Sequence, residues 1–80
     1  MANLSSRRMV SSKDLAEAVG LTLSTISYYT ALGLLKVSRR AGNKRLYDST
    51  EAKTRLRQIA LLRQKGYSLS LIRKQLATRE

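Results

Sequence analysis

The segment that decides the fold is residues 36–47, which read Lys-Val-Ser-Arg-Arg-Ala-Gly-Asn-Lys-Arg-Leu-Tyr. Gly42 and Asn43 tolerate a positive φ, so together with Ala41 they predict the tip of a short β-hairpin. The segment contains no acid, and its cations are Lys36, Arg39, Arg40, Lys44 and Arg45. Like charges crowded on two strands repel each other and lower stability. Because a polyanionic partner would relieve that repulsion, the hairpin indicates a surface that binds one.

Composition narrows the classes of function. The chain has 80 residues, enough for one small domain, and 16 Lys and Arg against 5 Asp and Glu give a formal net charge of +11. Such a charge indicates a polyanionic partner: DNA first, then RNA, then an anionic membrane. A membrane-surface helix would need its cations along one face of one long segment. Here the cations are spread over several short elements, which favours nucleic acid.

The residue types that are absent exclude several kinds of chemistry. The chain has no Cys and no His, which argues against disulfides, zinc sites, thiol sensing and His-based acid–base catalysis, and no cofactor is implied. No apolar run approaches the ~18–20 residues of a membrane span, and no signal peptide is recognisable. We therefore expect a cytoplasmic protein, associated with the nucleoid if its partner is DNA.

Two short helices are predicted before the hairpin. The first begins after Ser11, which has capping-box spacing to Asp14, and ends at Gly20. The second begins after Thr22 and ends at Gly33. Two short helices joined through a turn that contains glycine are typical of a helix-turn-helix.

The second helix has two distinct sides when its residues are placed at about 100° steps. The polar side consists of Ser24, Ser27, Tyr28 and Ala31. The more apolar side consists of Ile26, Tyr29 and Thr30. Because apolar side chains pack inward, the polar side should face solvent, with Thr25 and Leu32 at its borders and Tyr29 in the core.

Two further helices should follow the hairpin. One spans about residues 50–65, capped by Asp48 or Ser49, and the other spans about residues 69–77, beginning after Ser68. The predicted fold is therefore mainly α with a small β-hairpin, a winged helix-turn-helix in the order helix, helix, wing, helix, helix. It should occupy residues 10–80, after a flexible N-terminal arm at residues 1–9.

Three segments resemble motifs of the MerR-type transcription regulators. Residues 25–35, Thr-Ile-Ser-Tyr-Tyr-Thr-Ala-Leu-Gly-Leu-Leu, are similar to the TIRYYxxxGLL signature, and residues 42–47 are similar to the GNYRLY of the wing. Residues 56–72 resemble the LxxI…L…GFSLxxI segment. The resemblance covers nearly the whole chain, and the combination is specific. It implies a winged helix-turn-helix that binds promoter DNA, usually as a dimer on an inverted repeat, with the second helix in the major groove and the wing on the flanking backbone.

The chain departs from the family pattern at three places. Ser27 replaces the usual Arg before the tyrosine pair, Lys44 replaces the usual Tyr of the wing, and one extra residue lies between Tyr47 and Leu56. In addition, an effector-binding segment and a long dimerisation helix normally follow this domain, whereas the sequence stops at Glu80. A domain of a longer regulator and a complete minimal protein, excisionase-like or effectorless, are both open alternatives.

The predicted DNA-binding surface combines the second helix with the hairpin. Its residues are Ser24, Thr25, Ser27, Tyr28, Arg39, Arg40, Lys44 and Arg45. Tyr28 is the first candidate, because its hydroxyl can donate to a phosphate while its ring covers a sugar. Small hydroxyls such as those of Ser24 and Ser27 specify bases weakly. In the wing, Arg45 matches the family motif and is the best candidate for a backbone contact.

Other classes of function remain as alternatives. The same basic surface could serve an excisionase-like, recruiter or anti-activator module that docks on an acidic protein, and RNA binding is a third, weaker reading. We expect no enzyme, because Asp14 and Asp48 take positions at helix starts, where acids complement the helix dipole. The isolated chain should be a monomer, with a dimer in a full-length form or on DNA.

Overall fold

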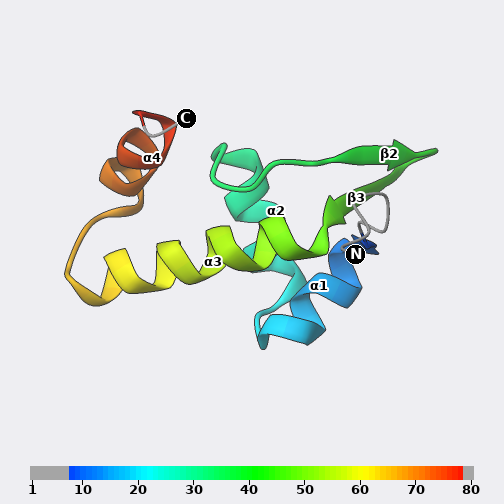
Figure 1. Cartoon of the computed structure of the whole chain (residues 1–80), viewed down its shortest axis with the longest axis horizontal. Helices are drawn as coiled ribbons and strands as arrows, with labels where there is room; N and C mark the ends of the chain where they lie inside the picture. The colour runs from blue at the N-terminus through cyan, green and yellow to red at the C-terminus, as the bar shows by residue number, and fades with distance from the viewer. Residues whose placement is uncertain (1–7, 79–80) are drawn as a thin grey trace, which may run out of the picture.

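The computed structural model describes residues 8–78 and confirms the predicted fold class. Most of the predicted arm, residues 1–7, lies outside the described part. The elements, in chain order, are β1 (Met9–Ser11), α1 (Ser12–Val19), α2 (Leu23–Ala31), β2 (Arg39–Ala41), β3 (Lys44–Asp48), α3 (Ser49–Gln64) and α4 (Leu69–Thr78) (Figure 1). Between residues 8 and 78 no helix combines the length and the apolar character needed to cross a membrane.

Side-chain caps start all four helices where the sequence predicts, and at α4 the N–H of Leu71 donates to Ser68 Oγ at 3.2 Å. The N–H of Asp14 donates to Ser11 Oγ at 3.1 Å, and the N–H of Thr25 donates to Thr22 Oγ1 at 3.1 Å. At α3 the choice between two caps falls on Asp48, whose Oδ1 accepts from the N–H of Glu51 at 3.0 Å. Each bond satisfies an amide that has no partner inside its own helix.

The end of α2 directs the chain into the wing. Gly33 has a φ of +83°, the left-handed conformation in which glycine carries no steric penalty. The N–H of Leu34 donates to the C=O of Tyr29 at 2.9 Å, and the N–H of Gly33 donates to the C=O of Thr30 at 3.1 Å. These two bonds form a Schellman motif. Beyond it, Leu34 and Leu35 are buried in the core.

The hairpin is tighter than the three-residue tip that the sequence suggested. Ala41 pairs with Lys44, so only Gly42 and Asn43 form the turn. Gly42 has a φ of +63°, while among the described residues no non-glycine residue has a positive φ. A two-residue turn with glycine first is the type II′ pattern, whose twist matches the strands it joins.

A third strand completes the sheet, and sequence analysis did not predict it. The strand order is β1-β3-β2, and β1 pairs antiparallel with β3 so that Val10 lies opposite Tyr47 and Met9 opposite Asp48. Met9, assigned above to the arm, is therefore part of the sheet. A three-residue strand is too short to show a periodic pattern, and its partner lies far along the chain. It matters because a two-stranded hairpin alone is marginal in water.

Tyr47 connects this sheet to the helices. Its side chain is fully buried, with 0% of its surface exposed, in a cluster with residues from α1, α2, α3 and α4. Its hydroxyl lies 2.8 Å from Thr30 Oγ1, which also donates to the C=O of Ile26 at 2.8 Å. Tyr47 therefore joins β3, the central strand, to α2. In Figure 1 the hairpin extends from this junction away from the helices.

The Tyr47–Thr30 contact should be measurable in the free energy of unfolding. We expect Tyr47→Phe to destabilise the domain by about 1 kcal/mol, because a buried hydrogen bond is lost and the hydroxyl of Thr30 keeps only its bond to the C=O of Ile26. For a domain of this size that corresponds to a fall in Tm of roughly 4–8 °C. Tyr28→Phe removes the same atom from an exposed ring and should leave Tm unchanged. Additive effects of Tyr47→Phe and Thr30→Val in a double-mutant cycle would show that the contact contributes nothing.

Candidate nucleic-acid interface

The outer face of α2 is exposed, as predicted from its periodicity. Ser24, Ser27 and Tyr28 are all exposed, and Tyr28 keeps 55% of its surface accessible. On the opposite side Ile26 has 0% exposure. Helix α2, of sequence Leu-Ser-Thr-Ile-Ser-Tyr-Tyr-Thr-Ala, carries no charged residue. The candidate reading surface is therefore neutral although the chain as a whole is strongly basic.

The two tyrosines of α2 divide into an exposed ring and a supporting ring. Their centroids lie 6.4 Å apart with the planes tilted by 39°, within the range of favourable aromatic pairs. Tyr29 is half-buried and packs against the core cluster. The ring of Tyr28 projects into solvent and packs against the ring of Tyr29, which the core holds in place. This contact restricts the positions that the Tyr28 hydroxyl can reach.

Thr25 differs from the other candidates on α2. It is half-buried, and its Oγ1 lies 2.9 Å from Thr22 Oγ1. Its hydroxyl therefore belongs to the network that caps the first turn of the helix. A contact between Thr25 and DNA stays a prediction, and it would have to compete with this local bond.

The four wing cations lie on two faces of the hairpin. Arg40 pairs with Arg45, and Arg39 pairs with Leu46. Because side chains alternate along a strand, Arg40 and Arg45 share the face that carries Tyr47, whereas Arg39 and Lys44 lie on the other. Arg39, Arg40 and Lys44 are exposed, and Arg45 is half-buried.

This arrangement places two arginines on the side of the wing that turns toward α2. Tyr47 reaches Thr30 of α2 from the same face on which Arg45 stands two residues away. The cationic and neutral surfaces are thus parts of one packed unit. No acid occurs between Glu17 and Asp48. The wing can therefore attract phosphates, and no carboxylate on α2 repels them.

One exposed residue on α2 was not singled out by sequence reasoning. Leu23, the first residue of the helix, is 51% exposed. At about 100° per residue it lies roughly 40° from Ser27, on the outward side. A leucine at a helix start is ordinarily a core residue, so its residue type gave no reason to expect it on the exposed face. Its angular position is the signal that could have found it.

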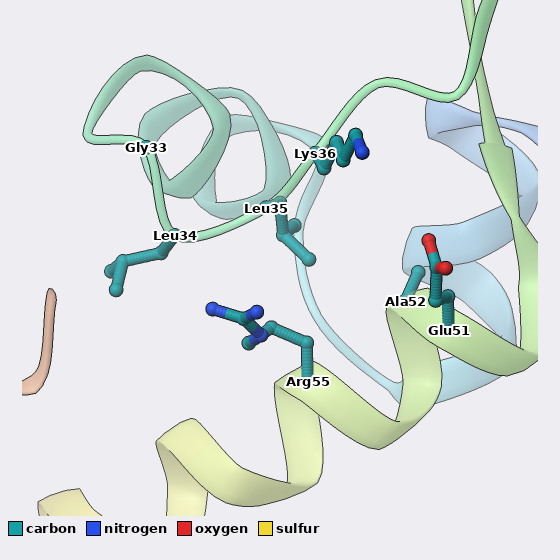
Figure 2. A pocket seen from close by; sticks show the side chains of 7 residues that line it. All are labelled: Gly33, Leu34, Leu35, Lys36, Glu51, Ala52 and Arg55. Carbon is teal, nitrogen blue, oxygen red and sulfur yellow. The ribbon is translucent and has the colours of Figure 1, made fainter. Parts of the chain in front are cut away.

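A surface depression lies between the loop after α2 and the first half of α3, with a volume of about 540 Å³. It is lined by Gly33, Leu34, Leu35, Lys36, Glu51, Ala52 and Arg55 (Figure 2). In Figure 2 Arg55 extends from α3 toward the loop, while Glu51 stands one turn earlier. With both signs of charge in its lining, the depression has no clear preference for an anionic or a cationic ligand.

Comparisons with known proteins agree with this architecture. Residues 10–78 match the family described as MerR HTH family regulatory protein. The chain is 47% identical over 62 residues to nodulation protein NolA of Bradyrhizobium elkanii and 45% identical over 62 residues to nodulation protein NolA of Bradyrhizobium diazoefficiens. These matches cover 76% of this chain, but 28% and 26% of the two relatives, so the chain spans about a quarter of their length. No solved structure matches significantly.

The chain belongs to the MerR family of helix-turn-helix regulatory proteins. The resemblance found in the sequence motifs is thereby confirmed. Membership supports a DNA-binding regulatory domain, and the description is that of a regulator rather than an enzyme. The individual contacts of α2 and of the wing are a separate question.

The facing arginines of the wing should destabilise the protein when no partner is bound. Arg40 and Arg45 are direct cross-strand neighbours, and like charges in that position repel. We expect Arg40→Gln to raise Tm in about 0.01 M salt and to have little effect in about 1 M salt, where the screening length falls to about 3 Å. Arg39→Gln is the matched control, because Arg39 faces Leu46. If the two variants melted alike at low salt, the repulsion would be negligible.

Proposed function

We propose that this chain is the sequence-specific, double-stranded DNA-binding domain of a MerR-type transcription regulator. In this proposal α2 enters the major groove and the wing contacts the flanking phosphate backbone. The observation that carries it is the joining of two unlike surfaces, the exposed neutral face of α2 and the cationic hairpin, through the Tyr47–Thr30 contact. Family membership supports the same function.

The two surfaces suit two different tasks in recognising a duplex. Contacts to phosphates position a protein on DNA, whereas contacts to base edges specify the sequence. Arg39, Arg40, Lys44 and Arg45 supply the charge for the first task. Ser24, Ser27 and Tyr28 supply hydroxyl groups for the second, and the hydroxyl of Tyr28 can also donate to a phosphate at the groove edge.

The neutral α2 favours a duplex over an acidic protein as the partner. A surface built to dock on an acidic protein gains from cations across its whole area. Here the exposed face of α2 has no cation, whereas four cations lie on the wing. A groove whose floor is bases and whose rims are phosphates has the matching distribution of charge.

Assembly and location follow from the same proposal. A single domain presents one recognition helix, so we propose that the isolated chain is a monomer that binds one half-site weakly. A dimer, in a longer protein or on DNA, would bind an inverted repeat with half-sites related by its two-fold axis. Sedimentation equilibrium that showed a tight dimer of this chain would contradict the first part. Its place of action would be the bacterial nucleoid.

Affinity for DNA should fall steeply as salt rises. If each domain neutralises ~4–6 phosphates, log K should fall with log salt at a slope of about −4 to −5, because bound cations release condensed counterions. Fluorescence anisotropy of a labelled random duplex, titrated between 50 and 200 mM salt as a rough working range, measures the slope. A flat response would rule out the electrostatic half of the proposal. Retention of no duplex even at low salt would favour the acidic-partner alternative.

Single substitutions should separate the tasks of the wing and of α2. Arg45→Ala should weaken binding to all duplexes alike and reduce the salt slope by about 1, because a phosphate contact carries no sequence information. Tyr28→Ala should weaken binding and change the preferred sequence. Arg63→Ala removes the same charge from an exposed position in the last turn of α3 and is the control. The C-terminal end of α3 lies far from the wing (Figure 1). Equal affinity of Arg45→Ala and the unmodified protein would disprove the wing assignment.

A further inference from the structure

The outward arc of α2 is notable for the groups that it does not contain. Its exposed members are Leu23, Ser24, Ser27, Tyr28 and Ala31. It has no Arg or Lys that could bind guanine O6 and N7, and no Asn or Gln that could bind adenine N6 and N7. The strong bidentate readers of both purines are therefore missing from the proposed recognition helix.

The groups that remain can recognise one feature of a base pair well. Hydroxyls accept from or donate to several bases and discriminate weakly. Apolar side chains, in contrast, distinguish thymine by contact with its 5-methyl group, which projects into the major groove. Leu23 is the large aliphatic side chain on this arc, with 51% of its surface exposed.

The position of Leu23 places it where a recognition helix meets bases. It directly follows the cap residue Thr22 and forms the first residue of α2. Helix-turn-helix proteins contact base edges mainly with the N-terminal residues of the second helix. The bonds of Thr22 to the N–H and to the hydroxyl of Thr25 hold the first turn of α2. The leucine therefore projects from an ordered helical turn.

We propose that Leu23 is a specificity-determining residue that packs against 5-methyl groups in the major groove, so that this domain selects thymine at the base steps under the start of α2. The proposal rests on the DNA-binding function proposed above. It goes further by naming the atoms that carry the sequence preference. In the free protein the leucine is exposed to water, and burial against methyl groups removes that apolar surface from solvent.

The experiment compares duplexes that differ only in methyl groups. A site is first selected from a random duplex pool, and the same duplex is then made with deoxyuridine in place of each thymidine in turn. Deoxyuridine keeps every hydrogen-bonding group of thymidine and lacks its 5-methyl. We expect one or two positions at which this change weakens binding about fourfold, the factor that corresponds to roughly 0.8 kcal/mol per buried methyl or methylene group.

Two variants assign the effect to a residue. With Leu23→Ala, deoxyuridine should no longer weaken binding at those positions, because the partner of the methyl group is gone. Leu61→Ala is the matched control: Leu61 is 53% exposed, on α3, and the same change there should leave the sensitivity intact. Alanine has the highest helix propensity, so neither variant should unfold its helix, and circular dichroism verifies this.

The possible results of the experiment test three separate claims: DNA binding, recognition of methyl groups, and the role of Leu23. If no duplex is retained from the pool, the DNA-binding function itself fails, and this inference with it. If a site is selected but deoxyuridine changes affinity nowhere, DNA binding stands and methyl recognition is wrong. If the sensitivity persists in Leu23→Ala, methyl groups are read by another residue, and the assignment to Leu23 is overturned.

Discussion

The hydrogen bond between the hydroxyl groups of Tyr47 and Thr30 is the contact that joins the two parts of the candidate DNA-binding surface, the wing and α2. Tyr47 stands on the central strand of the sheet, and Thr30 stands on the inward side of α2. A buried tyrosine that left its hydroxyl without a partner would lose stability, so the bond favours this geometry over a displaced one. The contact therefore sets the position of the wing relative to the second helix.

The small third strand supports the same junction from the other side. Val10 of β1 lies opposite Tyr47, so the residue that contacts α2 is on a strand that is paired along both of its edges. An isolated hairpin with two facing arginines would be poorly stable. Pairing with β1 and burial of Tyr47 offset that repulsion, and they allow the domain to carry a cationic wing that a free hairpin could not maintain.

The surface that results keeps the charged wing apart from the neutral face of α2. Four cations lie on a hairpin that projects from the helices, while the exposed face of α2 is neutral and consists of hydroxyl and apolar groups. Electrostatic attraction to a duplex acts at long range and is independent of sequence. A neutral helix adds little to that attraction. Any sequence preference of α2 must therefore come from the shape of the groove and from the pattern of hydrogen-bond donors and methyl groups on the bases.

The sequence by itself determined the helices, the hairpin and the outward face of α2. Helix starts were predictable because Ser11, Thr22 and Asp48 bond to amides three residues away, and the ends because glycine stops a helix locally. Only the tertiary structure decided that Met9 joins the sheet, that Tyr47 reaches Thr30, and that two of the four wing cations lie on the face turned toward α2. Those features join segments distant in the chain, and a local pattern cannot encode which distant partner a strand or a hydroxyl will meet.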